Sequence, residues 1–94
     1  ATPATRDELV LKGYTVWLAD AEAASDLFEA HAKLHEVQLE RYHEIKAFLE
    51  RKWQEDGGHV SSPWFGSVAA VRRGVGYERE YAEWCRWVLE QLQK

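Results

Sequence analysis

Residues 20–56 read DAEAASDLFEAHAKLHEVQLERYHEIKAFLERKWQED, and this stretch decides the fold. It contains neither glycine nor proline, and its apolar residues recur at helical spacing. The pattern predicts one helix from about Ala21 to Gln54, with Asp20 as its N-cap. Such a helix is about 50 Å long, whereas a compact domain of this chain length has a radius of gyration of only about 13 Å. We therefore expect a second copy of the chain to cover part of it.

The apolar residues of this helix form two neighbouring stripes. The first contains Leu27, His31, Leu34, Ile45 and Phe48, and the second contains Phe28, His35, Leu39, Tyr42, Leu49 and Trp53. Together they make a face broader than a narrow coiled-coil seam, so the helix can contact two neighbours at once. The sequence leaves open which stripe faces the rest of the chain and which faces a partner.

A second long helix is expected from Pro63 to about Gln93, because Ser62-Pro63 is typical of a helix start. Gly57-Gly58 ends the preceding helix, as glycine commonly does. The later helix has an apolar seam with a seven-residue period, which favours shallow left-handed packing of helices. The seam comprises Trp64, Val68, Val71, Val75, Glu78, Ala82, Cys85, Leu89 and Leu92, and only Glu78 interrupts its apolar character.

The N-terminal region adds a third, shorter helix. Residues 1–5 form a tail, and Thr5 to Glu8 match a capping box that opens a helix from Arg6 to about Leu18. The predicted fold is all-α, with one short and two long antiparallel helices in a single domain at residues 6–94. We expect it to assemble as a coiled-coil-like helical homodimer.

Composition argues against several classes of protein. The net charge of −4 lacks the basic footprint of a nucleic-acid-binding domain. No apolar run reaches the roughly 20 residues that span a bilayer, and no signal peptide is present. The single cysteine, Cys85, forms no internal disulfide and fits a buried structural thiol. These features predict a cytoplasmic protein that does not contact membranes.

Two histidines have a spacing that could bind a metal, but a structural role is the favoured interpretation. His31 and His35 share a helix face at the i, i+4 spacing that can chelate a transition metal. No glutamate follows His31 directly, so the zinc-protease signature is absent. We interpret both as half-buried interface residues and expect no metal or cofactor. No set of nucleophile, base and oxyanion donors occurs either, so we expect no enzyme activity.

Aromatic residues supply a possible effector pocket. The candidates are Trp17, Trp53, Trp64, Tyr81 and Trp84. Aromatic-lined pockets between helices commonly bind flat apolar ligands. The other interpretation of these rings, as anchors of the core and the interface, remains open and is favoured.

The order of several short motifs resembles a known family. The motifs are Arg6-Asp7-Glu8-Leu9 with Lys12, then Pro63, then Arg73-Gly74-x-x-Tyr77-Glu78, then Glu83-Trp84 and Leu89. They resemble the C-terminal domain of PadR-family transcriptional regulators, also described as the virulence-activator α C-terminal domain. The resemblance implies a homodimer whose winged-helix domains bind operator DNA. In many members of that family, a small and often aromatic effector releases the regulator from the DNA. The winged helix is absent from this chain, so DNA binding is carried over to no residue here.

Two functional hypotheses follow. The first is a dimerisation and effector-sensing domain of a PadR-like regulator that holds two winged-helix domains at a fixed spacing. The residues expected at its dimer interface are Leu27, His31, Leu34, Ile45, Val71, Val75 and Leu89. The alternative is a stand-alone helical bundle that binds a flat aromatic ligand between helices that carry tryptophan.

Overall fold

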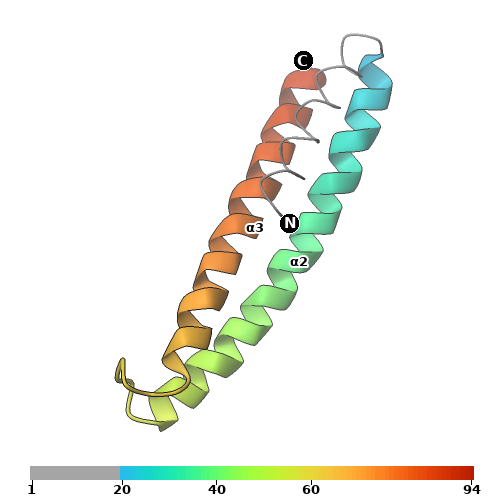
Figure 1. Cartoon of the computed structure of the whole chain (residues 1–94). Helices are drawn as coiled ribbons and strands as arrows, with labels where there is room; N and C mark the ends of the chain where they lie inside the picture. The colour runs from blue at the N-terminus through green and yellow to red at the C-terminus, as the bar shows by residue number, and fades with distance from the viewer. Residues whose placement is uncertain (1–19) are drawn as a thin grey trace.

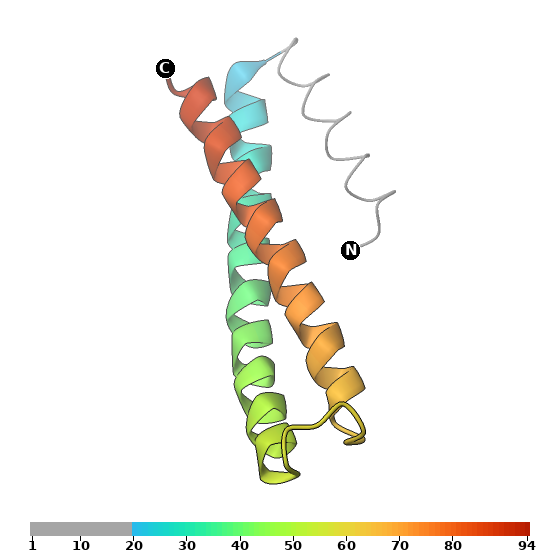
Figure 2. The same ribbon diagram turned by 90° about the vertical axis from the view of Figure 1, so that its left-hand side faces the viewer.

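The computed structural model describes residues 20–94, which form a hairpin of two long helices (Figure 1). Helix α2 spans Ala21–Glu55 and helix α3 spans Phe65–Leu92. The helices run antiparallel, so the C-terminus lies beside the beginning of α2 (Figures 1 and 2). Residues 20–94 contain no strand, and the prediction of an all-α fold is confirmed for them. They contain two helices rather than three, because the short helix expected at residues 6–18 lies outside the described residues.

Helix α2 has well-defined signals at both ends. Asp20 is the N-cap, and its carboxylate accepts hydrogen bonds from the backbone N–H groups of Glu22 at 3.0 Å and Ala23 at 3.3 Å. At the other end, Gly57 and Gly58 have φ of 99° and 68°. Their N–H groups donate to the carbonyls of Gln54 at 3.0 Å and Trp53 at 2.9 Å, which is a Schellman arrangement.

The start of α3 differs from the prediction. Pro63 was expected at the first helical position, but α3 begins at Phe65. Pro63 instead lies in a turn in which the N–H of Phe65 donates to the carbonyl of Ser62 at 3.1 Å, three residues back. The Ser62 hydroxyl accepts from the N–H of Trp64 at 3.1 Å, so Ser62 stabilises this turn rather than the helix itself. The regular helical bonds begin with Val68 donating to Trp64.

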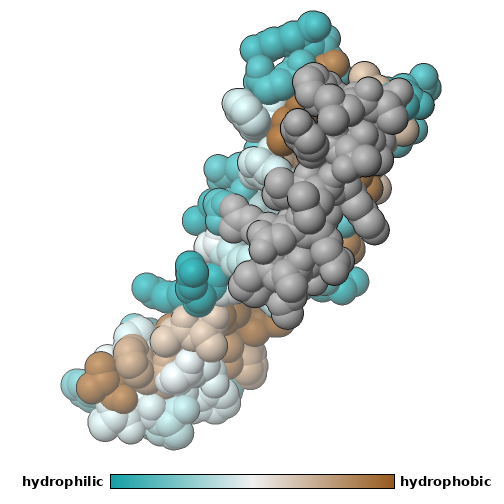
Figure 3. Space-filling model, turned by 45° about the horizontal axis from the view of Figure 1, so that its top comes forward, coloured by the Kyte–Doolittle hydropathy of each residue, from teal (hydrophilic) through white to brown (hydrophobic). Residues whose placement is uncertain are grey.

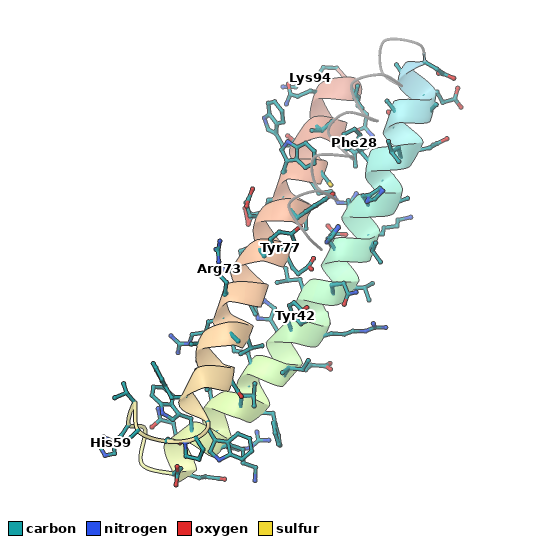
Figure 4. All side chains as sticks on the ribbon, in the orientation of Figure 1. Phe28, Tyr42, His59, Arg73, Tyr77 and Lys94 are labelled. Atoms are coloured by element: carbon teal, nitrogen blue, oxygen red, sulfur yellow. The ribbon has the colours of Figure 1, made fainter. Side chains whose placement is uncertain are left out.

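The main hydrophobic cluster lies between the first half of α2 and the second half of α3. Its members are Phe28, Ala32, Tyr81, Cys85 and Leu89, and each is at most 4% exposed. Ala24 and Ala32 have no exposed surface, and Ala32 belongs to this cluster. The second stripe of α2, which includes Phe28 and Tyr42, therefore faces α3 (Figure 4). From the predicted seam of α3, the buried residues are Val68, Val75, Glu78, Ala82, Cys85 and Leu89.

The hairpin is long and thin. Its principal extents are 55 × 22 × 15 Å and its radius of gyration is 17.1 Å. A compact chain of similar length has a radius of gyration of about 13 Å. Within residues 20–94, each helix packs against the other along one face, and its remaining faces take no part in this contact.

Two ion-pair clusters connect the helices along one flank. The Arg86 guanidinium donates to both carboxylate oxygens of Glu36, at 2.9 and 2.7 Å, and to Glu29 at 2.8 Å. Arg72 donates to Glu50 nearer the connection, with its Nε at 2.7 Å. The bond to Arg86 is the main reason that the pKa of Glu36 lies below its ordinary value. These groups are partly exposed, so each pair adds little stability, but together they orient the helices.

Gly74 lets a tyrosine of the neighbouring helix approach closely. A Cβ atom on Gly74 would lie 2.9 Å from Cε2 and 3.1 Å from Cδ2 of Tyr42, whereas one on Gly76 would meet nothing within 4 Å. Both glycines lie inside α3, where glycine costs stability relative to alanine. Only Gly74 has a packing reason to be glycine.

We expect opposite effects from alanine at these two positions. Gly76→Ala gains helix propensity and should stabilise the fold by about 0.5–1 kcal/mol. Gly74→Ala forces the Tyr42 ring to move, and overpacking costs about 1–3 kcal/mol, which offsets that gain. Urea unfolding followed by circular dichroism measures both. In a Tyr42→Ala background, Gly74→Ala should stabilise the fold through its helix propensity, because the ring is no longer there to move. Equal stabilisation by Gly74→Ala and Gly76→Ala in the parent protein would contradict the close contact.

Candidate functional site

The predicted interface residues fall into exposed and buried groups. Leu34 and Ile45 are 52% and 45% exposed. Leu27, His31 and Val71 are partly buried, and Leu27 packs against the main cluster. Val75 and Leu89 are each 4% exposed and lie inside the hairpin. Leu34 and Ile45 are therefore the members of the set that a partner could reach directly.

These two residues belong to a larger exposed surface, which we name the apolar face of α2. It consists of Leu34, Val37, Ile45 and Phe48, each more than 40% exposed. Leu34 and Val37 lie one turn apart, and Ile45 and Phe48 repeat that pair three turns later. The Phe48 ring has the charged ends of Arg51 and Lys52 each 5.7 Å from its centroid. Exposed apolar residues gathered in this way on a helix mark an interaction surface.

A second apolar patch lies at the end of the hairpin that carries the connection between the helices (Figure 3). Val60 is 76% exposed there. The indole N–H of Trp53 donates to the carbonyl of His59 at 2.9 Å, and its ring lies 5.5 Å from that of Phe65. The aromatic rings therefore order the connection and leave Val60 outside it.

A buried polar pair connects the two helices near their centre. His35 of α2 and Glu78 of α3 are 6% and 4% exposed, and the Nδ1 atom of His35 is hydrogen-bonded to the Glu78 carboxylate. The Tyr81 ring stacks on His35 with centroids 3.8 Å apart and planes 21° apart. The His31 ring lies 6.4 Å from the His35 ring between centroids, with the two planes 20° apart. This arrangement explains why Glu78 interrupts the apolar seam of α3.

The hydrogen-bonded pair of His35 and Glu78 favours one alignment of α3 along α2. Buried charges need a partner, since the cost of removing them from water is several kcal/mol per ion. Sliding α3 along α2 by one turn would leave both groups buried without each other. The sequence contained a signal for this pairing, one polar residue in each of two apolar stripes, but nothing in it showed that the two would meet.

The aromatic candidates do not form one pocket in the described residues. Tyr81 and Trp84 lie in the main cluster, with ring centroids 5.8 Å apart. Trp53 and Trp64 lie at the connection end, where Trp64 packs edge-on against Phe48 at 6.4 Å. Trp64 and Tyr81 are 17 positions apart in the sequence, which is about 25 Å along the helix. Trp17, the fifth candidate, lies outside the described residues.

Cys85 and the histidines have structural surroundings. Cys85 is fully buried and unpaired, and burial raises the pKa of its thiol to about 11. Within residues 20–94, no three His, Cys, Asp or Glu side chains converge as a metal site requires. Neither of the two described helices is long and apolar enough to cross a membrane.

Comparison with known proteins identifies the domain. Residues 5–93 match the family described as virulence activator alpha C-term, which covers nearly the whole chain. The chain therefore belongs to the family of virulence-activator α C-terminal domains, and this membership indicates a regulatory role. Searches of curated proteins and of solved structures gave no match.

We expect His35 and Glu78 to be strongly coupled. Replacing Glu78 alone with leucine leaves His35 buried without its partner and should destabilise the hairpin by on the order of 3–5 kcal/mol. Replacing His35 and Glu78 together with leucine should cost much less, because an apolar pair suits the seam. A double-mutant cycle from urea unfolding measures the coupling. Additive single effects would show that the two side chains do not depend on each other.

We expect Cys85 to react slowly with thiol reagents in the folded protein. At pH 8, a shift of pKa from 9.0 to about 11 lowers the thiolate fraction about a hundredfold, and burial blocks access further. Labelling with a chromogenic disulfide with and without urea measures this difference. Similar rates in both conditions would contradict a closed cluster around Cys85.

Proposed function

We propose that this domain dimerises and senses an effector within a PadR-like transcriptional regulator of the cytoplasm. The observation that carries this proposal is the exposed apolar face of α2 on a domain whose family is regulatory. The PadR assignment is supported by the motif order from Arg73-Gly74 to Leu89 and rests on that resemblance. On this proposal the domain itself is not an enzyme and holds no cofactor.

The shape of the hairpin supports a need for a partner. Helix α2 has 35 residues, and the second stripe of apolar residues already faces α3. The four side chains of the apolar face of α2 remain exposed beside that contact, although Phe48 packs edge-on against Trp64, and covering the face would remove more of their apolar surface from water. Burying such a side chain from full exposure contributes about 1.5–3 kcal/mol, and each of these four, being near half exposed, would contribute roughly half of that. This gain favours association over an isolated hairpin.

A second copy of the chain is the occupant that we propose for this face. Two-fold dimers are by far the commonest homo-oligomers, and a two-fold axis pairs a surface with its own copy. The apolar face of α2 contains two similar pairs, Leu34/Val37 and Ile45/Phe48. If two copies of α2 met antiparallel, the first pair of one copy would lie against the second pair of the other. Partly buried Leu27, His31 and Val71 would border the contact.

A dimer of this kind would serve regulation through geometry. Winged-helix domains attached to the two copies would be held at a separation that matches the two half-sites of an operator. Operator DNA would be contacted only by those domains. An effector, such as a small aromatic molecule, would act by favouring one arrangement of the helices over another.

The alternative function, a stand-alone bundle that binds a flat aromatic ligand, has less support. Its candidate residues Trp53 and Trp64 lie at one end of the hairpin, and Tyr81 and Trp84 lie in the main cluster. In the described residues no single ligand could contact all four.

We expect charged substitutions on the apolar face of α2 to dissociate the dimer. Leu34→Glu and Ile45→Glu each place a carboxylate where the copies would meet, whereas both positions are already exposed in the hairpin. Sedimentation at tens of micromolar should show a dimer for the parent protein and a monomer for the variants, with helix content unchanged. Val60→Glu, at an exposed valine in the connection, is the matched control and should remain dimeric. A monomeric parent protein would overturn the proposal.

A further inference from the structure

A groove runs along the flank of the hairpin that carries the Arg86 ion pairs. It lies between α2 and α3 and has a volume of about 390 Å³. Leu39 of α2 and Ala82 of α3 supply its apolar lining. None of the residues that line it belongs to the apolar face of α2, so the groove is a separate surface from the proposed dimer contact.

On one side of the groove, the charged side chains already form ion pairs with one another. Arg86 lines the groove and is held by Glu36 and by Glu29, both of which accept hydrogen bonds from its guanidinium. These bonds fix the wall, and the positive charge of Arg86 is shared between two carboxylates. Arg86 therefore offers little to an incoming anion.

The α3 side of the groove also exposes an indole ring between two carboxylates. Glu83, Trp87 and Glu90 lie at i, i+4 and i+7 on α3, which places them on one helix face. Trp87 is 58% exposed. Both glutamates are exposed, and neither forms an ion pair with a residue of the described part of the chain. An exposed tryptophan costs free energy in water, and tryptophan is enriched among residues that dominate protein interfaces.

The charges that line the groove favour a cationic group in the molecule that binds there. Three carboxylates line it, from Glu36, Glu83 and Glu90, against the guanidinium groups of Arg79 and Arg86. The lining residues therefore carry one more negative than positive charge, and Glu29, which also binds Arg86, is balanced by its ion pair with Lys33. A cation above the Trp87 ring would interact with the face of the indole and with both flanking carboxylates.

We propose that this groove is a docking site for a basic, amphipathic segment of another protein. An arginine or lysine of the partner lies over Trp87 between Glu83 and Glu90, and an apolar side chain one turn away fills the space over Leu39 and Ala82. Helices dock into apolar grooves through residues with this spacing. The proposal does not depend on the dimer, since the two surfaces share no residue.

A labelled peptide tests the proposal on the whole chain. The probe is an alanine-based helical peptide of 16 residues with two leucines and two arginines on one face, and fluorescence anisotropy measures its binding. The control peptide has glutamate in place of arginine. The parent protein should bind the arginine peptide at least about tenfold more tightly than the glutamate peptide, and the difference should shrink with added salt.

Two variants locate the site. Trp87→Ala should weaken binding about tenfold, and Glu83→Gln with Glu90→Gln should weaken it several-fold and reduce its salt dependence. Glu44→Gln, at an exposed glutamate of α2 that does not line the groove, is the matched control and should bind like the parent. Equal binding of both peptides, or undiminished binding by the glutamine variant, would overturn the proposal. Dissociation of a dimer by Trp87→Ala would also overturn it, because the groove would then be a contact between copies.

Discussion

The hydrogen-bonded pair of His35 and Glu78 fixes how the two helices of this domain meet. Apolar seams alone tolerate sliding, because one leucine or valine can replace another at nearly the same cost. A buried carboxylate and imidazole cannot be separated so cheaply. His35 is hydrogen-bonded to Glu78 and stacks on the Tyr81 ring. The main cluster around Phe28 and Cys85 lies on one side of this pair along the hairpin. Gly74 and Tyr42 then meet on the other side.

That alignment leaves surface uncovered on both flanks of the hairpin. On one flank, Arg86 and Arg72 connect α3 to carboxylates of α2, and the groove beside Trp87 opens next to Arg86. Away from that flank, α2 exposes Leu34, Val37, Ile45 and Phe48. A domain only 15 Å thick in its smallest dimension cannot enclose these residues. The two proposals therefore concern these exposed surfaces of residues 20–94.

The candidate site was partly predictable. The sequence placed the apolar residues of α2 on two neighbouring stripes and left open which of them faces α3. In the structure the buried residues Phe28 and His35 belong to the second stripe. The burial of Ala24 and Ala32 was not predicted, because alanine carries no strong periodic signal. The groove was missed as well, since Trp87 and Glu36 lie on different helices and become neighbours only through the hairpin.

The sequence by itself determined the helical class, the long run of α2, its cap at Asp20 and its end at Gly57-Gly58, because these depend on interactions within a few residues. It also marked Glu78 as an exception in its seam. Only the tertiary structure decided that His35 is the partner of Glu78 and that Gly74 makes room for Tyr42. Such contacts join residues more than thirty positions apart, and their geometry depends on the relative placement of two helices, which no local pattern specifies.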